Sequence, residues 1–376
     1  MGKFTLWQTE GGGGLKGITM RQMVLILFTV MLMNATVDLP KTLMKYAGLG
    51  GWVTILMASV LFGLAGVLVV AMNNRFPGKM LYDYTEQLTG KFIARMVAAL
   101  FTVYFILYAV LLSTTYCNIL YHNFLIKTPQ WFELLFAMPV FGYAAYKGIT
   151  NVARMFEIIG VAIFVVALSI HGSMLFLGHP EYVLPLYIPA ETGRVFSALP
   201  HTFVPFFGVA LITAVPICVK KKKQSLWTVF LAIICIGLIL AFVSETCIMM
   251  IGPNEIVHYT DPIVVAIRLV EIPKVAFLTR IDILYLLFGS LGFYAAIIIL
   301  YSSAVEFASK MLPKLHRLIT TAAIGLIIFV LSLFAFGIDN FRVVFADKMT
   351  FGPLIAITFI LILWVIAKIK KVGEEK

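Results

Sequence analysis

The chain alternates between long apolar runs and short polar segments. Six runs contain no Asp, Glu, Lys or Arg, and each is long enough for a membrane-spanning helix of roughly 20 mostly apolar residues: 50–74, 96–126, 224–244, 283–305, 318–338 and 349–367. Four weaker runs carry charges or prolines: 21–46, 131–146, 151–177 and 195–219. The pattern predicts an all-α polytopic membrane protein with ten transmembrane helices.

Two of the weaker runs are interrupted at matching positions. Residues 31–41 read MLMNATVDLPK in the first span, and residues 200–208 read PHTFVPFFG in the sixth. Proline removes an intrahelical hydrogen bond, so we expect helices 1 and 6 to be broken. These spans begin two groups of five, 18–177 and 193–368, which an external linker, 178–192, would join. Because five is odd, the second group enters the membrane from the opposite side, which predicts a 5+5 inverted repeat.

Paired interruptions of this kind point to a binding site between the two halves. A broken helix exposes N–H groups that attract a carboxylate and carbonyl groups that attract an ammonium. The sequence therefore predicts a mid-membrane site for a zwitterion such as an amino acid. The candidate ligand contacts are Ala35, Thr36, Val37 and Asp38 at the first interruption, Pro205, Phe206, Phe207 and Gly208 at the second, and Tyr108 in the third span.

Each of these residues also has a purely structural interpretation. The prolines can simply kink helices whose neighbours satisfy the freed carbonyls, and Asp38 can pair with Lys41 or Lys45 near the outer interface. The aromatic residues can serve only as packing. We expect structural or gating roles for Pro40 and for Arg280 and Asp282, which lie at the start of the eighth span. Glu157, His171, Glu245 and Glu306 are further ionisable residues within or beside spans and are candidates for proton coupling.

Two polar segments carry apolar residues at helical spacing. After Pro77 and Gly78, the pattern predicts a short helix at the membrane surface, on the residues Met80, Leu81, Tyr84 and Leu88. Residues 263–270 predict a second short helix outside the membrane, where it could cover or gate a site. The alternative for this second segment is an ordinary connecting loop.

The net charge of +11 reflects membrane topology rather than nucleic-acid binding. If ten spans are assumed, 20 of the 29 lysines and arginines fall on one side, including the run KKKK at 220–223. This is the positive-inside pattern and places both termini in the cytoplasm. Residues 1–17 would form a flexible cytoplasmic leader and residues 369–376 a cytoplasmic tail.

Composition and motifs give no indication of an enzyme. The chain is 61% hydrophobic and 12% charged, so it has too few polar residues to cover the apolar core of a soluble protein. It has no Walker loop, no GxSxG and no HExxH, and its four cysteines form no CxxC. We therefore predict no catalytic residues, no cofactor and no metal site.

Three stretches together resemble one known family. They are ITMRQMVLILFTVMLMNATVDLPKTLMKYAG at 18–48, RFPGKMLYDY at 75–84 and FLTRIDILYLLFG at 277–289. They are similar to the B subunit of endospore germinant receptors, within the amino acid–polyamine–organocation superfamily. The resemblance implies a LeuT-like fold in the inner spore membrane and a complex with the receptor A and C subunits. It also implies nutrient sensing, in which a small germinant binds and the complex triggers germination.

The sequence departs from that family in ways that affect the ligand. Thr279 stands where a glutamate is frequent, the sixth span carries no acid, and NATVD replaces the glycine-rich break of the superfamily's amino acid transporters. The leading prediction is a germinant-sensing subunit. The alternatives are a proton-coupled amino acid or polyamine transporter, and a conducting or structural subunit whose pocket is vestigial.

Overall fold

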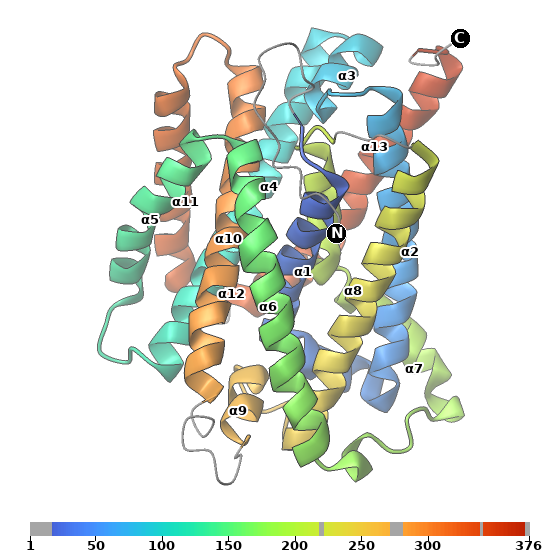
Figure 1. Cartoon of the computed structure of the whole chain (residues 1–376), viewed down its shortest axis with the longest axis vertical. Coiled ribbons are helices and arrows are strands. Elements are labelled where there is room, and N and C mark those ends of the chain that lie inside the picture. Colours follow the sequence, from blue (N-terminus) through green and yellow to red (C-terminus); the bar gives the residue numbers. More distant parts are fainter. Residues whose placement is uncertain (1–16, 218–221, 271–280, 339–340, 373–376) are drawn as a thin grey trace, which may run out of the picture.

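A computed structural model of the chain describes residues 17–217, 222–270, 281–338 and 341–372. Nearly all of these residues are helical, and the long helices run between the two ends of one bundle (Figure 1). The α-helices are α1 (Met20–Ala47), α2 (Gly51–Arg75), α3 (Leu81–Thr89), α4 (Lys91–Asn123), α5 (Gln130–Tyr146), α6 (Ile149–Leu177), α7 (Thr192–Ser197), α8 (Lys222–Ile251), α9 (Pro262–Arg268), α10 (Ile281–Met311), α11 (Arg317–Phe336), α12 (Phe341–Met349) and α13 (Gly352–Ile369).

Seven stretches are long and apolar enough to cross a membrane, and they contain α2, α4, α6, α8, α10, α11 and α13. The other three expected spans correspond to α1, to the 17-residue α5 and to an irregular segment. In α1 the apolar stretch is Met20–Ala35, and in the irregular segment it is Val204–Thr213. A multi-pass helical membrane protein is therefore confirmed, whereas the count of ten is not.

The first predicted interruption is wrong in its detail. α1 is one helix from Met20 to Ala47, with Pro40 inside it. Within a bilayer no water replaces lost backbone bonds, so losing one hydrogen bond at a proline costs less than unwinding several residues. The end of α1 is secured by Arg194, whose guanidinium donates to the carbonyls of Lys45, at 3.0 Å, and Tyr46, at 3.1 Å.

The second predicted interruption is confirmed as a departure from α-helix. After the short α7, the chain forms two 3₁₀ helices, Leu199–Thr202 and Val204–Thr213. Runs of 3₁₀ helix longer than three or four residues are uncommon. Side chains from neighbouring helices donate to carbonyls of this segment, and the bonds are Thr54 Oγ1 to Val195 at 3.2 Å, Asn73 Nδ2 to Ile212 at 3.1 Å and Tyr104 Oη to Phe207 at 3.4 Å. The irregular span is thus held by its neighbours rather than by its own α-helical bonds.

In four of the five expected pairs, corresponding spans of the two halves pack directly against one another. α2 contacts α8, α4 contacts α10, α5 contacts α11, and α1 contacts the Val204–Thr213 helix. This is the arrangement expected of an inverted repeat, in which equivalent helices meet across a pseudo-twofold axis. α1 also contacts α6 and α10, which places it in the interior of the bundle.

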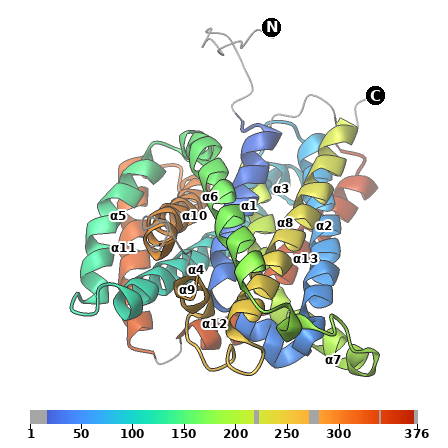
Figure 2. The ribbon, with the colours of Figure 1, turned by 60° about the horizontal axis from the view of Figure 1, so that its bottom comes forward.

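The two short helices lie at opposite ends of the bundle. α3 lies at one end, together with the end of α13 and the start of α8, and α9 lies at the other end (Figure 1). α9 and α12 are close together in both views (Figure 2). Both predicted short helices are confirmed as helices. The end that carries α3 is called the inner end below, and the end that carries α9 the outer end.

Some predictions fall outside the described residues. These include Arg280, most of the 1–17 leader, half of the KKKK run and the last four residues of the 369–376 tail. The side chains of Thr36, Val37 and Asp282 are also outside what the structure describes, although their backbone lies in α1 and α10.

Candidate functional site

Two cavities meet at one ion pair near the outer end. The inner cavity has a volume of about 60 Å³, and its polar lining comes from Asn34, Asp38, Thr42, Thr115, His201 and Arg342. The outer vestibule has a volume of about 230 Å³, and its polar lining comes from Asp38, Lys41, Asn118, His122, Gln130, Thr260 and Arg342. Asp38 and Arg342 line both cavities. The ion pair therefore lies where the two cavities adjoin.

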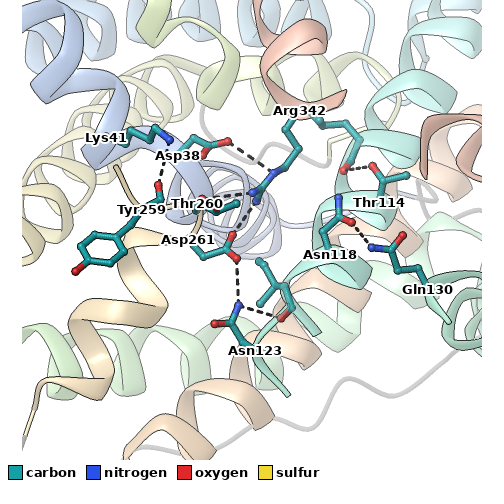
Figure 3. A network of polar contacts seen from close by, with 12 residues as sticks. Asp38, Lys41, Thr114, Asn118, Asn123, Gln130, Tyr259, Thr260, Asp261 and Arg342 are labelled. Carbon is teal, nitrogen blue, oxygen red and sulfur yellow. Dashed lines mark hydrogen bonds and ion pairs between the residues drawn. The ribbon is translucent and has the colours of Figure 1, made fainter. Parts of the chain in front are cut away.

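Arg342 is the centre of a charged network (Figure 3). Its Nη1 lies 3.1 Å from Asp261 Oδ1, and its Nε lies 3.9 Å from Asp38 Oδ2. Its Nη2 also donates to the carbonyl of Thr260 at 3.4 Å. The planar, forked guanidinium can reach two carboxylates at once, which a lysine ammonium does less well. Arg342 thus joins α1 to the start of α9.

The ion pairs of this network differ in burial. The side chains of Arg342 and Asp261 are 11% and 7% exposed, whereas that of Asp38 is 33% exposed. Asp261 also accepts a hydrogen bond from Asn123 Nδ2 at 3.1 Å. The Arg342–Asp261 pair is therefore the tight, dry part of the network. The longer contact to Asp38 is the part that solvent or a ligand can reach.

Local sequence explains how these groups come to point together. Asp261 lies at the start of α9, directly before Pro262, and its side chain makes no capping hydrogen bond, which leaves its carboxylate for Arg342 in the first turn of α12. Lys41, one turn beyond Asp38 on α1, donates to the carbonyl of Tyr259 at 3.1 Å. The alternative in which Asp38 pairs with Lys41 or Lys45 is therefore not what the structure shows, because the recorded ion pair is with Arg342.

An aromatic cluster fills the predicted position of the ligand. Tyr108 stacks on Phe207, with ring centroids 4.1 Å apart and ring planes 6° apart. The Tyr108 hydroxyl is buried and has no hydrogen-bond partner among the described residues. Phe206 faces the opposite way and stacks on Phe62 of α2, with centroids 5.1 Å apart. The stacked rings therefore close the position that the sequence predicted for the ligand.

The predicted site residues separate into two groups. Asp38 and Pro205 line the inner cavity. Ala35, Tyr108, Phe206 and Phe207 are buried in the core, as is Gly208, which packs against Met31. The structure therefore brings the two predicted interruptions together, but only part of the predicted set faces open space.

Sequence reasoning missed two important charges, Arg342 and Asp261. Arg342 and Lys348 are the two basic residues that come just before the final apolar run. In that position Arg342 resembles an ordinary interface anchor. Asp261 precedes a proline at a helix start, which resembles an ordinary cap. Only the packing of α9 against α1, and of α12 against α4, brings Arg342 next to both Asp261 and Asp38. In the described part of the chain, no group of three His, Cys, Asp or Glu residues could hold a metal ion.

The architecture is that of a known transporter fold. Mhp1, a nucleobase-cation-symport-1 family transporter solved in a closed conformation with bromovinylhydantoin bound, matches with a TM-score of 0.56. The match covers 90% of this chain and 77% of that one at 12% sequence identity, so it speaks for the fold alone. The fold is accordingly LeuT-like.

Sequence comparison gives the family. A family model described as "Spore germination protein" matches residues 17–340. Spore germination protein YndE of Bacillus subtilis (strain 168) is 24% identical over 301 residues, which are 79% of this chain and 82% of that protein. Spore germination protein B2 of the same organism is 23% identical over 272 residues, or 71% and 72% of the two chains. The chain therefore belongs to the spore germination protein family.

Proposed function

We propose that this protein is the nutrient-sensing subunit of a germination receptor in the inner spore membrane, with both termini in the cytoplasm. A small germinant would enter through the outer vestibule and bind in the inner cavity. The observation that carries this proposal is the place of Asp38 and Arg342, which line both cavities. In this proposal a ligand that passes from the vestibule to the inner cavity meets this ion pair on its way.

The chemistry of the ion pair favours an amino acid. A ligand carboxylate can take the place of Asp38 on Arg342, and a ligand ammonium can then pair with the released Asp38 carboxylate. A zwitterion thereby gives every buried charge a partner. A neutral or singly charged ligand in the same place would leave a buried charge unpaired. Asn34 and Thr115 offer further hydrogen-bonding groups in the same cavity.

Binding would also change the shape of the protein. A cavity of about 60 Å³ is small beside the roughly 300–1,000 Å³ of ordinary ligand sites, so the closed arrangement must widen. The movable parts are the Arg342–Asp38 contact and the stacked ring of Phe207. A ligand that binds the widened arrangement better shifts the population toward it. Partner subunits of the A and C type would detect this shift.

The test is ligand binding to the purified receptor, with its partner subunits, measured by thermal shift against amino acids, sugars and nucleosides. We expect one amino acid to stabilise the complex and Asp38→Asn to raise its half-saturating concentration at least about tenfold, the equivalent of about 1.4 kcal/mol. Glu86→Gln, at the opposite end of the bundle, is the matched control and should bind normally. Normal binding by Asp38→Asn in an intact complex would refute this site. No ligand in the whole panel would favour a conducting or structural subunit.

A proton-coupled amino acid or polyamine carrier is the second candidate, and the fold shared with Mhp1 favours it. A sensor and a carrier would use the same cavity and differ in whether the ligand leaves on the other side. Ligand-dependent flux into liposomes by the isolated protein would support the carrier. Binding without flux would support the sensor.

A further inference from the structure

Glu133 is a carboxyl group in an unusual position on α5. It lies on the inward side of the helix, beside Leu134 and one turn before Ala137, and these residues line one small cavity. Trp131, Phe132 and Phe136 on the other side are exposed apolar residues, as expected of a lipid-facing surface. Both carboxyl oxygens of Glu133 are buried and have no hydrogen-bond partner among the described residues.

The cavity beside Glu133 lies between α4, α5 and α10. Its volume is about 10 Å³, close to the minimum that holds one water molecule. α4 contributes Ser113, Tyr116 and Cys117, and α10 contributes Tyr294. The Ser113 hydroxyl is also buried and without a partner in the part of the chain that the structure describes. The Glu133 carboxyl and the Ser113 hydroxyl, both without a hydrogen-bond partner among the described residues, therefore face the same water-sized cavity.

Among the described residues, no positively charged side chain lines the cavity beside Glu133. The titratable groups that line the cavity are the two tyrosines and Cys117, and neither α6 nor α11, which also contact α5, contributes a lining residue. An ionised carboxylate without a partner is very costly to bury. A protonated carboxyl group fits the same place, because it is neutral and its O–H can donate to Ser113 directly or through one water.

The outer vestibule lies one helical turn from this carboxyl. Gln130, three residues before Glu133, donates from Nε2 to Asn118 Oδ1 at 2.5 Å, and both side chains line the vestibule together with the exposed His122 (Figure 3). On the inward side, Tyr116 donates to Ser290 Oγ of α10 at 2.8 Å. Glu133 therefore lies between an aqueous entrance and a polar contact that joins α4 to α10.

We propose that Glu133 is a proton-binding site, supplied from the outer vestibule and occupied in the closed arrangement. Release breaks the carboxyl O–H bond and passes the proton to water in the vestibule. The remaining carboxylate puts an unbalanced charge between α4, α5 and α10 and favours their separation. This proposal goes beyond germinant sensing and does not depend on where the germinant binds.

Infrared spectroscopy of the whole protein in lipid nanodiscs tests the proposal directly. At neutral pH we expect a carbonyl-stretch band of a protonated carboxylic acid that titrates away as the pH rises. Glu133→Gln should remove one component of that band, whereas the matched control Glu255→Gln, which removes an exposed acid, should leave the band unchanged. The same band and titration in Glu133→Gln as in the wild type would overturn the proposal.

Stability provides a second, independent measurement. An amide has nearly the size of the neutral acid, so Glu133→Gln should fold and should lose less thermal stability than the wild type as the pH rises. Failure of Glu133→Gln to fold, or equal pH dependence in both proteins, would contradict the proposal. Wild-type stability that requires sodium or potassium at neutral pH would assign a metal cation to the site and would equally overturn it.

Discussion

The two ends of the bundle are closed by different physical means. At the outer end, Arg342 joins Asp38 to Asp261 over a polar vestibule of about 230 Å³. At the inner end, α3 presses apolar side chains, Leu81, Tyr84 and Leu88, against the bundle. Charged contacts are present at that end too, since Arg317 pairs with Glu306, whose side chain is 16% exposed, and Lys310 pairs with Asp83 of α3.

This difference indicates which end opens more easily. Breaking the Arg342–Asp38 contact at the outer end separates charged groups that water or a zwitterion can satisfy again, although α9 also buries Ile263, Val264 and Ile267 at this end. Opening the inner end exposes apolar surface at roughly 25 cal/mol per Å², and no small ligand offsets that cost. The inner end is further fixed by Lys370, which donates to the carbonyl of Leu88 at 2.7 Å, and by Arg75, which donates to that of Ala367 at 2.9 Å. A germinant is therefore expected to act on the outer end first.

The largest expected effect comes from Arg342→Ala. It leaves Asp38 and Asp261 without their shared cation, and removing one partner of a buried ion pair costs about 3–5 kcal/mol. We expect the outer end to open. A cysteine at Leu112, in a protein whose native cysteines are replaced by alanine, should then react at least about tenfold faster with a membrane-impermeant thiol reagent.

Lys348→Ala is the matched control for this experiment, because Lys348 is an exposed cation on the same helix, α12. Its labelling rate should equal that of the parent protein. An equally slow reaction in Arg342→Ala would mean that the ion pair does not close the outer end, and the contrast between the two ends would fail.

Leu88→Ala tests the apolar inner end and is expected to have an intermediate effect. Leu88 is 1% exposed, and truncating a buried leucine costs about 2–5 kcal/mol in the free energy of unfolding. The variant should unfold at a lower temperature without any gain in labelling at the outer end. Phe92→Ala, which removes a side chain that is 76% exposed, should change stability by less than about 0.5 kcal/mol. A labelling increase in Leu88→Ala would show that the two ends open together.

The smallest effect is expected from Lys310→Gln, which removes a largely exposed ion pair of the inner end. Lys310 Nζ lies 2.7 Å from Asp83 Oδ1, but the two side chains are 42% and 25% exposed. Such surface pairs contribute about 0–1 kcal/mol and weaken in salt. Thermal unfolding at low and high salt measures this contribution. A loss as large as that of Leu88→Ala would mean that charge, rather than apolar packing, holds the inner end.

Local patterns in the sequence predicted most of the fold. The six uncharged runs became α2, α4, α8, α10, α11 and α13, because a helix in lipid must satisfy its own backbone groups. The same reasoning found α3 and α9 from apolar spacing and found the irregular sixth span from its prolines. For this span the prediction succeeded because the prolines lie close together, and little α-helix can form between them.

The effect of a single proline was not predictable in this way. Pro40 does not end the helix, because α1 continues past it to Ala47. Whether a freed carbonyl unwinds a helix depends on the groups packed around it, and the sequence does not state which groups these are. The sequence likewise does not state how deeply Ala35 and Phe207 are buried. Both lie in the core, among neighbours from distant parts of the chain.

The sequence by itself determined the membrane class, the long spans, the short surface helices and the irregular sixth span. It did so because hydrophobic runs, helical spacing and proline act on residues that are near one another in the chain. Only the tertiary structure decided that Asp38 meets Arg342 and Asp261, and that Glu133 and Ser113 share one cavity. These pairings arise where helices from distant parts of the chain pack together, and a side chain's partner is set by that packing.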